Sequence, residues 1–208
     1  MTSPKSQSNI EKTLRASGVN LIAGVDEAGR GPCAGPLVIA AVILKDPFAD
    51  SLAKVRDSKE LSEKVREELF PVIQEEALAF SIIEFSPEEI DRIGLHKCNI
   101  EGMRRVVASL AVTPDYVLTD GYAIEGIEIP NLAVWKGDQV AISISAASIL
   151  AKVHRDRIMV ELDAQYPGYG LAGHKGYITA AHTKALKELG VTGIHRKSFA
   201  NIASLLAE

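Results

Sequence analysis

The sequence predicts an α/β fold in which helices flank a mixed five-stranded sheet, with a helical extension at the C-terminal end. Short apolar segments rich in β-branched residues come first in close succession and then alternate with helical patterns. From about Thr179 onward the chain shows helical patterns alone. Hydrophobic residues make up 47% of the 208 residues, which is enough apolar material for a proper core.

The first three predicted strands lie at 21–25 (LIAGV), 37–44 (LVIAAVIL) and 77–85 (ALAFSIIEF). A glycine-bearing turn at 29–35 joins the first two, so we expect a β-hairpin meander. Apolar residues at helical spacing predict a helix over 62–76 before the third strand. Pro71 should kink or shorten this helix because proline lacks the backbone N–H.

The second half alternates helices with short strands. Ser86-Pro87-Glu88-Glu89 is a capping box that starts a helix, which Gly94 interrupts and Thr113-Pro114 ends. Two short strands follow at 116–119 and 132–135, each ending close to an acidic residue. The longest predicted helix covers 141–162 and has small residues near its start, which would let it approach the sheet closely. One or two further helices are predicted after about Thr179, around 185–189 and 200–206.

Composition limits the class of protein. The net charge of −4 argues against coating nucleic acid through bulk charge but allows a focused site. The two cysteines, Cys33 and Cys98, are far apart, so neither a disulfide framework nor a zinc site is expected. Residues 1–9 are polar with no apolar core, which excludes a signal peptide, and no run is long enough to span a membrane. We expect a cytoplasmic monomer with a tail and short helix at 1–18 and a single catalytic domain at 19–208.

Three predicted strands end in carboxylates: Asp26-Glu27 after the first, Asp120 after the fourth and Asp138 after the fifth. Taken singly, an aspartate at a strand end is more often a turn residue or a helix cap. Together, carboxylates beside buried strands would repel one another unless a cation neutralised them. Oxygen ligands without histidine or cysteine favour Mg²⁺ or Mn²⁺. Asp26 and Glu27 can serve one site only if the chain turns between them, because strand side chains alternate faces.

A series of ordered motifs then carries a resemblance to a known family. GVDEAGRGPCAGPLVIAAVIL at 24–44 resembles the opening of the type 2 ribonucleases H. The family's further blocks follow in order: DSKELS (57–62), LTDG (118–121), KGD (136–138), SAASILAKVHRD (145–156), HKGY (174–177) and HRKSF (195–199). The resemblance covers nearly the whole chain after the tail, and it implies a ribonuclease H-like fold.

The resemblance also implies the site residues. It makes Asp26, Glu27, Asp120 and Asp138 the catalytic carboxylates that bind two Mg²⁺ or Mn²⁺ ions. It makes Gly29-Arg30-Gly31 the loop that contacts the ribonucleotide, where glycine lets the main chain approach the 2′-hydroxyl. It makes Tyr177 the aromatic residue that stacks on the following deoxyribose. Ile178 stands where the family usually has proline.

Basic residues give weaker signals. Lys59 of DSKELS is assigned to phosphate contact, and Lys152, Arg155 and Arg157 form a basic cluster whose alternative is a solvated helix face. Asp156 is expected in an ion pair with a nearby arginine. His174 and His195 are expected to form structural hydrogen bonds and are left outside the catalytic set.

The implied activity is that of an endoribonuclease that hydrolyses the RNA strand of RNA/DNA hybrids and nicks duplex DNA on the 5′ side of embedded ribonucleotides. Two-metal hydrolysis would leave 5′-phosphate and 3′-hydroxyl ends. Three alternatives stay open: a type 3 ribonuclease H, a non-catalytic hybrid-binding module and a Mg²⁺ phosphatase. The type 3 enzymes normally carry an extra N-terminal domain, for which about 20 residues before the first strand leave no room.

No nucleotide cofactor is expected. The segment 168–173 matches G-x-G-x-x-G, but it follows a helical pattern and Pro167, whereas a dinucleotide site needs a strand before it. The sequence also has no P-loop motif and no G-x-S-x-G motif. P-loop enzymes and serine hydrolases of that type are therefore excluded.

Overall fold

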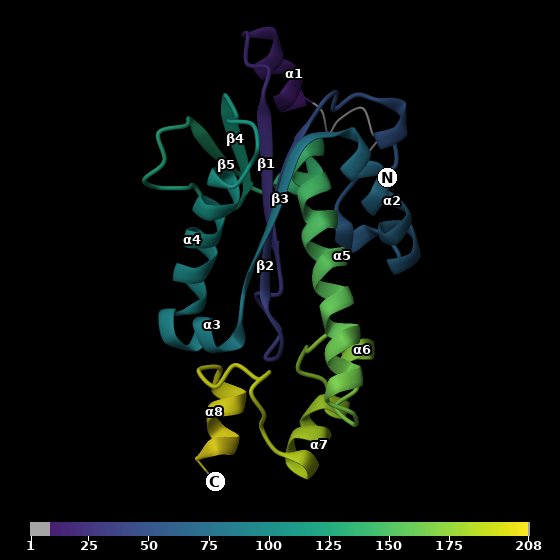
Figure 1. Ribbon diagram of the computed structural model, residues 1–208, viewed down its shortest axis with the longest axis vertical. Helices are drawn as coiled ribbons and strands as arrows, with labels where there is room; N and C mark the ends of the chain where they lie inside the picture. Colours follow the sequence, from purple (N-terminus) through teal and green to yellow (C-terminus); the bar gives the residue numbers. More distant parts are fainter. Residues whose placement is uncertain (1–8, 208) are drawn as a thin grey trace.

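The computed structural model describes residues 9–207 and shows one five-stranded mixed sheet with the strand order β3-β2-β1-β4-β5 (Figure 1). The strands are β1 (Ile22–Ala28), β2 (Leu37–Leu44), β3 (Ala77–Phe85), β4 (Tyr116–Asp120) and β5 (Asn131–Val134). The first three strands form the predicted antiparallel meander, and β4 and β5 are added parallel to β1. The predicted mixed α/β sheet is therefore confirmed.

Helices cover both faces of this sheet. On one face lie α2 (Glu63–Glu76) and α5 (Ile142–Gln165), and on the other lie α3 (Pro87–Ile93) and α4 (Leu95–Ala108) (Figure 1). Every residue of β2 is buried, because Val38 and Ala40 pack on the α5 side and Leu37 and Ile39 on the α4 side. Burial on both faces explains why this strand is apolar throughout and does not alternate.

The long helix α5 approaches β1 at Gly24. A Cβ atom added to Gly24 would lie 2.1 Å from the backbone carbonyl carbon of Ser143, so only glycine fits at this contact. The small residues near the start of α5 therefore have the role predicted for them. They bring the beginning of α5 against the strand that carries Asp26 and Glu27.

A side chain from the N-terminal helix α1 (Asn9–Ala16) caps the start of α5. Ala141, at the N-cap position of α5, supplies no side-chain hydrogen bond. The carboxylate of Glu11, 1% exposed, accepts hydrogen bonds from the backbone N–H groups of Ile142 (3.0 Å) and Ser143 (2.9 Å). These are two of the donors that a helix start leaves unpaired. Of the tail predicted at 1–9, all but Asn9 lies outside the described residues.

The helices α2, α3 and α4 begin and end mostly where the sequence predicts. The capping box is present: Ser86 Oγ accepts from the N–H of Glu89, and the Glu89 carboxylate accepts from the N–H of Ser86. Gly94 separates α3 from α4 with a positive φ of 95°, as the predicted interruption requires. Pro71, in contrast, does not shorten α2, which continues to Glu76. The packing of Leu69, Phe70 and Ile73 in the core outweighs the hydrogen bond that proline cannot donate.

The C-terminal part forms the predicted helical extension beyond the end of the sheet (Figure 1). It contains α6 (Leu171–His174), α7 (Ala180–Leu189) and α8 (Ala200–Leu206). Buried apolar residues of these helices and of the end of α5, including Met159, Leu186 and Ile202, pack around Cys33 and Ala34 of the β1–β2 connection. Within the described residues, no helix is long and apolar enough to cross a lipid bilayer.

Candidate active site

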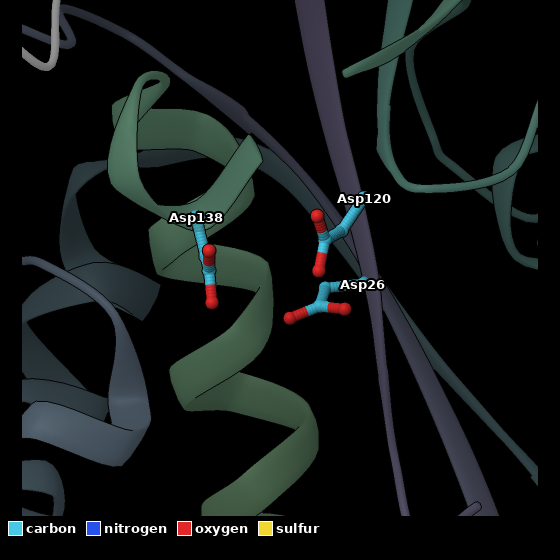
Figure 2. A group of neighbouring side chains, drawn as sticks. All are labelled: Asp26, Asp120 and Asp138. Atoms are coloured by element: carbon cyan, nitrogen blue, oxygen red, sulfur yellow. The ribbon is translucent and has the colours of Figure 1, made fainter. Parts of the chain in front are cut away.

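Three aspartates from separate parts of the chain meet at one end of the sheet. Asp26 lies in β1, Asp120 ends the neighbouring parallel strand β4, and Asp138 lies in the short 3-10 turn η4 (Gly137–Gln139). Each offers one carboxylate oxygen, and these three oxygens lie within 4.8 Å of one another (Figure 2). We call these residues the aspartate cluster.

The strand register and one hydrogen bond set this arrangement. Pairing of Val25 with Thr119 places Asp26 and Asp120 side by side at the same edge. Asp120 Oδ1 accepts a hydrogen bond of 2.8 Å from the N–H of Gly137. That bond fixes the turn that carries Asp138. The turn begins at Lys136, which adopts a left-handed backbone conformation with φ 53°.

Burial makes the aspartate cluster electrostatically unfavourable without a counter-charge. Asp26 is 4% exposed and Asp138 is 2% exposed. Burial, followed by repulsion from Glu27 and Asp120, raises the pKa of Asp26 well above its ordinary value. Burial and the negative charges of Asp57 and Asp120 raise the pKa of Asp138 to about 7. A hard divalent cation would relieve this repulsion, and oxygen-only ligands match Mg²⁺ or Mn²⁺.

Glu27 lies beside this cluster but not in it. The chain does not turn between Asp26 and Glu27, because β1 continues to Ala28 and its register with β2 is unbroken through both acids. The two side chains therefore point to opposite faces of the sheet. The turn that would bring Asp26 and Glu27 to the same face of the sheet is therefore absent. Glu27 reaches the same end of the sheet from the α4 side.

The Glu27 carboxylate is nevertheless strained electrostatically. Its Oε1 is 3.3 Å from an Arg30 guanidinium nitrogen, and its Oε2 is buried with no hydrogen-bond partner among residues 9–207. Burial raises the pKa of Glu27; Arg30 opposes this shift, and the negative charge of Asp120 adds to it. Glu27 thus has one oxygen left for a ligand that enters the site.

Two hollows open on these acids. One of about 580 Å³ contains Glu27, Asp120 and Asp138, and a smaller one of about 270 Å³ contains Asp26 and Glu27. Lys59 and Arg30 line both. Glu27 lines both hollows as well, so each of the four predicted carboxylates borders at least one of them, although the tight cluster has three members.

The structure also brings the predicted substrate loop and Tyr177 together. Gly29, Arg30, Gly31 and Tyr177 all line the smaller hollow. A Cβ atom added to Gly31 would lie 3.4 Å from the Tyr177 ring, so the loop main chain and the aromatic ring form adjacent walls. The Arg30 guanidinium lies over the Tyr122 ring at 4.6 Å, which holds it at the mouth of the site.

Lys59 lies next to the aspartate cluster. Its Nζ is 3.7 Å from Asp138 Oδ2, and its side chain is 78% exposed. Partial burial lowers the pKa of Lys59, but the charges of Asp138 and Asp57 outweigh that effect and raise it. Sequence reasoning missed Asp57, which is buried beside Asp138 and accepts a hydrogen bond from the N–H of Lys59. Its place in the same DSKELS block was the available signal.

The other predicted basic residues divide into separate roles. Arg155 is 1% exposed and donates to the carbonyls of Ala34, Pro36 and Lys175, so it is a structural residue. Arg157 forms an exposed ion pair with Glu67.

Asp156 has the ion pair expected for it. It lies 3.6 Å from Arg66 and 2.7 Å from Lys152. Trp135, which sequence reasoning did not single out, is 82% exposed at the rim of the larger hollow.

Known proteins share this fold and sequence. A ribonuclease HII from Mycobacteroides abscessus is 55% identical over 193 residues, which span 93% of this chain and 82% of the relative. The crystal structure of ribonuclease H2 from Pyrococcus horikoshii superposes with a TM-score of 0.77 at 28% identity, covering 88% of this chain and 96% of the other. Bst-RNase HIII, solved with Mn²⁺, shares the fold with a TM-score of 0.70 at 20% identity, covering 90% of this chain and 69% of the other.

The fold and the carboxylate site together define a metal-dependent nuclease with a ribonuclease H-like fold. The family model for ribonuclease HII matches residues 23–202, and the chain belongs to this family. It is therefore an enzyme with ribonuclease H activity on RNA/DNA hybrids. This membership confirms the resemblance and decides against a type 3 enzyme.

Proposed function

We propose that this enzyme also nicks duplex DNA on the 5′ side of single embedded ribonucleotides, as well as cutting the RNA strand of hybrids. The observation that supports this proposal is the shared hollow of Gly29, Arg30, Gly31 and Tyr177 beside the aspartate cluster. The main chain of the Gly29–Gly31 loop can approach a 2′-hydroxyl, and the Tyr177 ring opposite it can stack on a sugar that lacks this hydroxyl. A junction between one ribonucleotide and a following deoxyribonucleotide presents that pair of groups.

The acids supply the catalytic part of the proposal. Asp26, Asp120 and Asp138 would hold divalent metal, with Glu27 completing the set through the oxygen that has no partner in the described structure. Two bound Mg²⁺ or Mn²⁺ ions would activate water and stabilise the leaving oxygen, giving 5′-phosphate and 3′-hydroxyl ends. Arg30 and Lys59, at the mouth of the hollows, would contact the phosphates on either side of the cut.

The test is cleavage of three matched duplexes: all DNA, DNA with one ribonucleotide, and an RNA/DNA hybrid. Each is incubated with Mg²⁺ or Mn²⁺, with and without chelator, and the product ends are mapped. We expect metal-dependent cutting of the second and third, on the 5′ side of the ribonucleotide in the second. Uncut junctions beside cleaved hybrids would contradict the junction proposal.

Membership of the ribonuclease HII family also decides against the hybrid-binding module and the phosphatase, because the family is one of nucleases. We also propose that the enzyme acts as a monomer, which light scattering coupled to gel filtration tests directly.

A further inference from the structure

The loop that carries Tyr177 is held tightly by its neighbours. Gly176 has φ 81°, and a Cβ atom there would lie 2.5 Å from the carbonyl oxygen of Ala34. Its own carbonyl accepts a 3.0 Å hydrogen bond from the N–H of Cys33. The preceding carbonyl, of Lys175, accepts from Arg155. The main chain just before Tyr177 is therefore fixed from the side of the β1–β2 connection and α5.

The carbonyl of Tyr177 itself is held by one buried histidine, which contacts a second buried histidine. His182 in α7 is 0% exposed, and its Nδ1 lies 3.0 Å from the Tyr177 oxygen. His182 Nε2 lies 3.2 Å from Nε2 of His195, which is 1% exposed. His195 Nδ1 lies 3.1 Å from the backbone nitrogen of Thr192. We call this series of contacts the histidine relay.

The chemistry of its two ends fixes every proton in the histidine relay. The Thr192 backbone N–H can only donate, so His195 Nδ1 accepts and its proton is on Nε2. His182 Nε2 must then accept, which leaves the His182 proton on Nδ1. That proton is donated to the Tyr177 carbonyl, which can only accept. His195 Nδ1 also lies 3.1 Å from Thr192 Oγ1, and His182 Nδ1 lies 3.8 Å from Cys33 Sγ; both partners can donate or accept, so they do not alter the assignment. Two neutral histidines in opposite tautomers therefore satisfy every contact of the relay.

The three neighbouring histidines, His174, His182 and His195, do not form a metal site. His174 stacks on His182 with 4.4 Å between ring centroids, but its two ring nitrogens contact the Tyr169 carbonyl and the Gly176 N–H. Both ring nitrogens of His182 and of His195 are likewise engaged in the relay. A zinc ion needs free lone pairs on its ligands, and these rings have committed theirs to hydrogen bonds.

We infer that His182 and His195 are positioning residues that set where the Tyr177 ring stands in the substrate hollow. This inference rests on the proposed function, because it assumes that Tyr177 stacks on the sugar beside a ribonucleotide. Tyr177 is 48% exposed, whereas its carbonyl is hydrogen-bonded to the buried ring of His182. The histidine relay thus transmits the packing of the C-terminal extension to a residue at the substrate.

The first test measures the tautomers directly, without substrate. Ring ¹⁵N chemical shifts at pH 7.5 are expected to show His182 protonated on Nδ1 and His195 protonated on Nε2. The half-buried His154, which pairs with Glu84 outside this region, serves as the internal reference for a histidine outside the relay. Reversed or averaged tautomers at either relay position would overturn the inference.

The second test compares two variants at one position. His182→Leu removes the donor to Tyr177, whereas His182→Asn keeps a nitrogen at the same place along the side chain. Losing this hydrogen bond should lower kcat/KM for a single-ribonucleotide junction about three- to tenfold, mainly through KM, and lower it less for a long hybrid. His182→Asn should recover most of that loss.

A matched control separates positioning from general loosening. Leu186→Ala removes buried packing from the same helix, α7, and leaves the hydrogen bond to Tyr177 in place. Its ratio of junction to hybrid cleavage should stay within about twofold of the parent enzyme. An equal shift of the ratio in Leu186→Ala, or no recovery in His182→Asn, would overturn the inference. A parent enzyme that cuts hybrids but not junctions would instead refute the proposed function, while the tautomer measurement still decides the relay.

Discussion

The aspartate cluster and the histidine relay are both groups of buried polar side chains, but they are built in opposite ways. In the histidine relay each donor faces an acceptor from Thr192 to Tyr177, so the group is complete within the protein. In the aspartate cluster three carboxylates face one another, although Gly137 donates to Asp120 and Lys59 lies near Asp138, and neighbouring Glu27 has an oxygen without a partner in the described structure. The difference teaches that the histidine relay is satisfied without a ligand and can hold a loop in place, whereas the aspartate cluster is stabilised only when a cation binds.

The largest expected effect comes from neutralising one member of the aspartate cluster. Asp120→Asn should lower cleavage of hybrids about a thousandfold or more, which corresponds to about 4 kcal/mol of transition-state stabilisation. Hybrid binding should remain, because the Gly29–Gly31 loop is untouched. The matched control is Asp115→Asn, which changes the residue directly before β4 begins, at the end of the strand away from Asp120. This variant should retain activity. Parent-like cleavage by Asp120→Asn would remove this residue from the catalytic set.

The second largest effect is on the pH dependence of stability, to which the histidine relay and the aspartate cluster contribute with opposite signs. Burial, with repulsion from His182, lowers the pKa of His195 to about 4, so the unfolded chain binds the proton first as pH falls from about 6.5. Stability should therefore decrease between pH 6.5 and 4, by about 3 kcal/mol from this residue. Asp138 opposes this trend, because its raised pKa of about 7 makes the folded state take up a proton first.

Denaturant unfolding of the parent and His195→Gln in chelator, at pH 7.5 and pH 5, measures this balance. His195→Gln should lose less stability between pH 7.5 and pH 5 than the parent, because it lacks the buried histidine that destabilises the folded state as pH falls. Equal losses would show that His195 does not contribute to the pH dependence. The control is His154→Gln, which should follow the parent.

A third, smaller effect is a gain in stability, although most substitutions of buried residues lower it. Without metal, Asp138→Asn should raise the free energy of unfolding at pH 8 by about 2 kcal/mol, because it removes a buried charge that its neighbours repel. Adding Mn²⁺ should stabilise the parent more than the variant. Thermal unfolding with and without Mn²⁺ checks both statements, and a destabilised metal-free variant would contradict the account of the cluster.

The smallest expected effect concerns the Glu11 cap, a third kind of buried acid that is paired with backbone donors. Burial raises the pKa of Glu11 despite its bonds to Ser143 and Ile142. Glu11→Gln should lower the free energy of unfolding by about 1 kcal/mol at pH 7.5. The control is Lys12→Gln, at the exposed neighbouring position of α1, and denaturant unfolding compares both variants with the parent. Equal free energies of unfolding for Glu11→Gln and the parent would show that the cap contributes nothing.

Much of the fold could be predicted from sequence, because periodicity, capping residues and glycines act locally. The run at 37–44 and the capping box at Ser86 are such cases. The expected shortening of the helix at Pro71 does not occur, since the tertiary packing of α2 outweighs a local preference that sequence alone reveals.

The site divides in the same manner. Motif blocks pointed to Asp26, Asp120 and Asp138, and the parallel pairing of β1 with β4 explains why two of them meet. The separation of Glu27 from the tight cluster depends on how far β1 stays extended, which no local pattern indicated. The histidine relay joins residues from three segments through single hydrogen bonds, and neither spacing nor composition records such contacts.

Trp135 gives the molecule a built-in optical reporter. It is the chain's single tryptophan, it is 82% exposed, and it borders the hollow that contains Asp120 and Asp138. Intrinsic fluorescence excited at the indole band therefore originates beside the aspartate cluster. Arrival of a nucleic acid duplex can be followed in real time on the unlabelled enzyme, with calcium or a disabled variant preventing turnover.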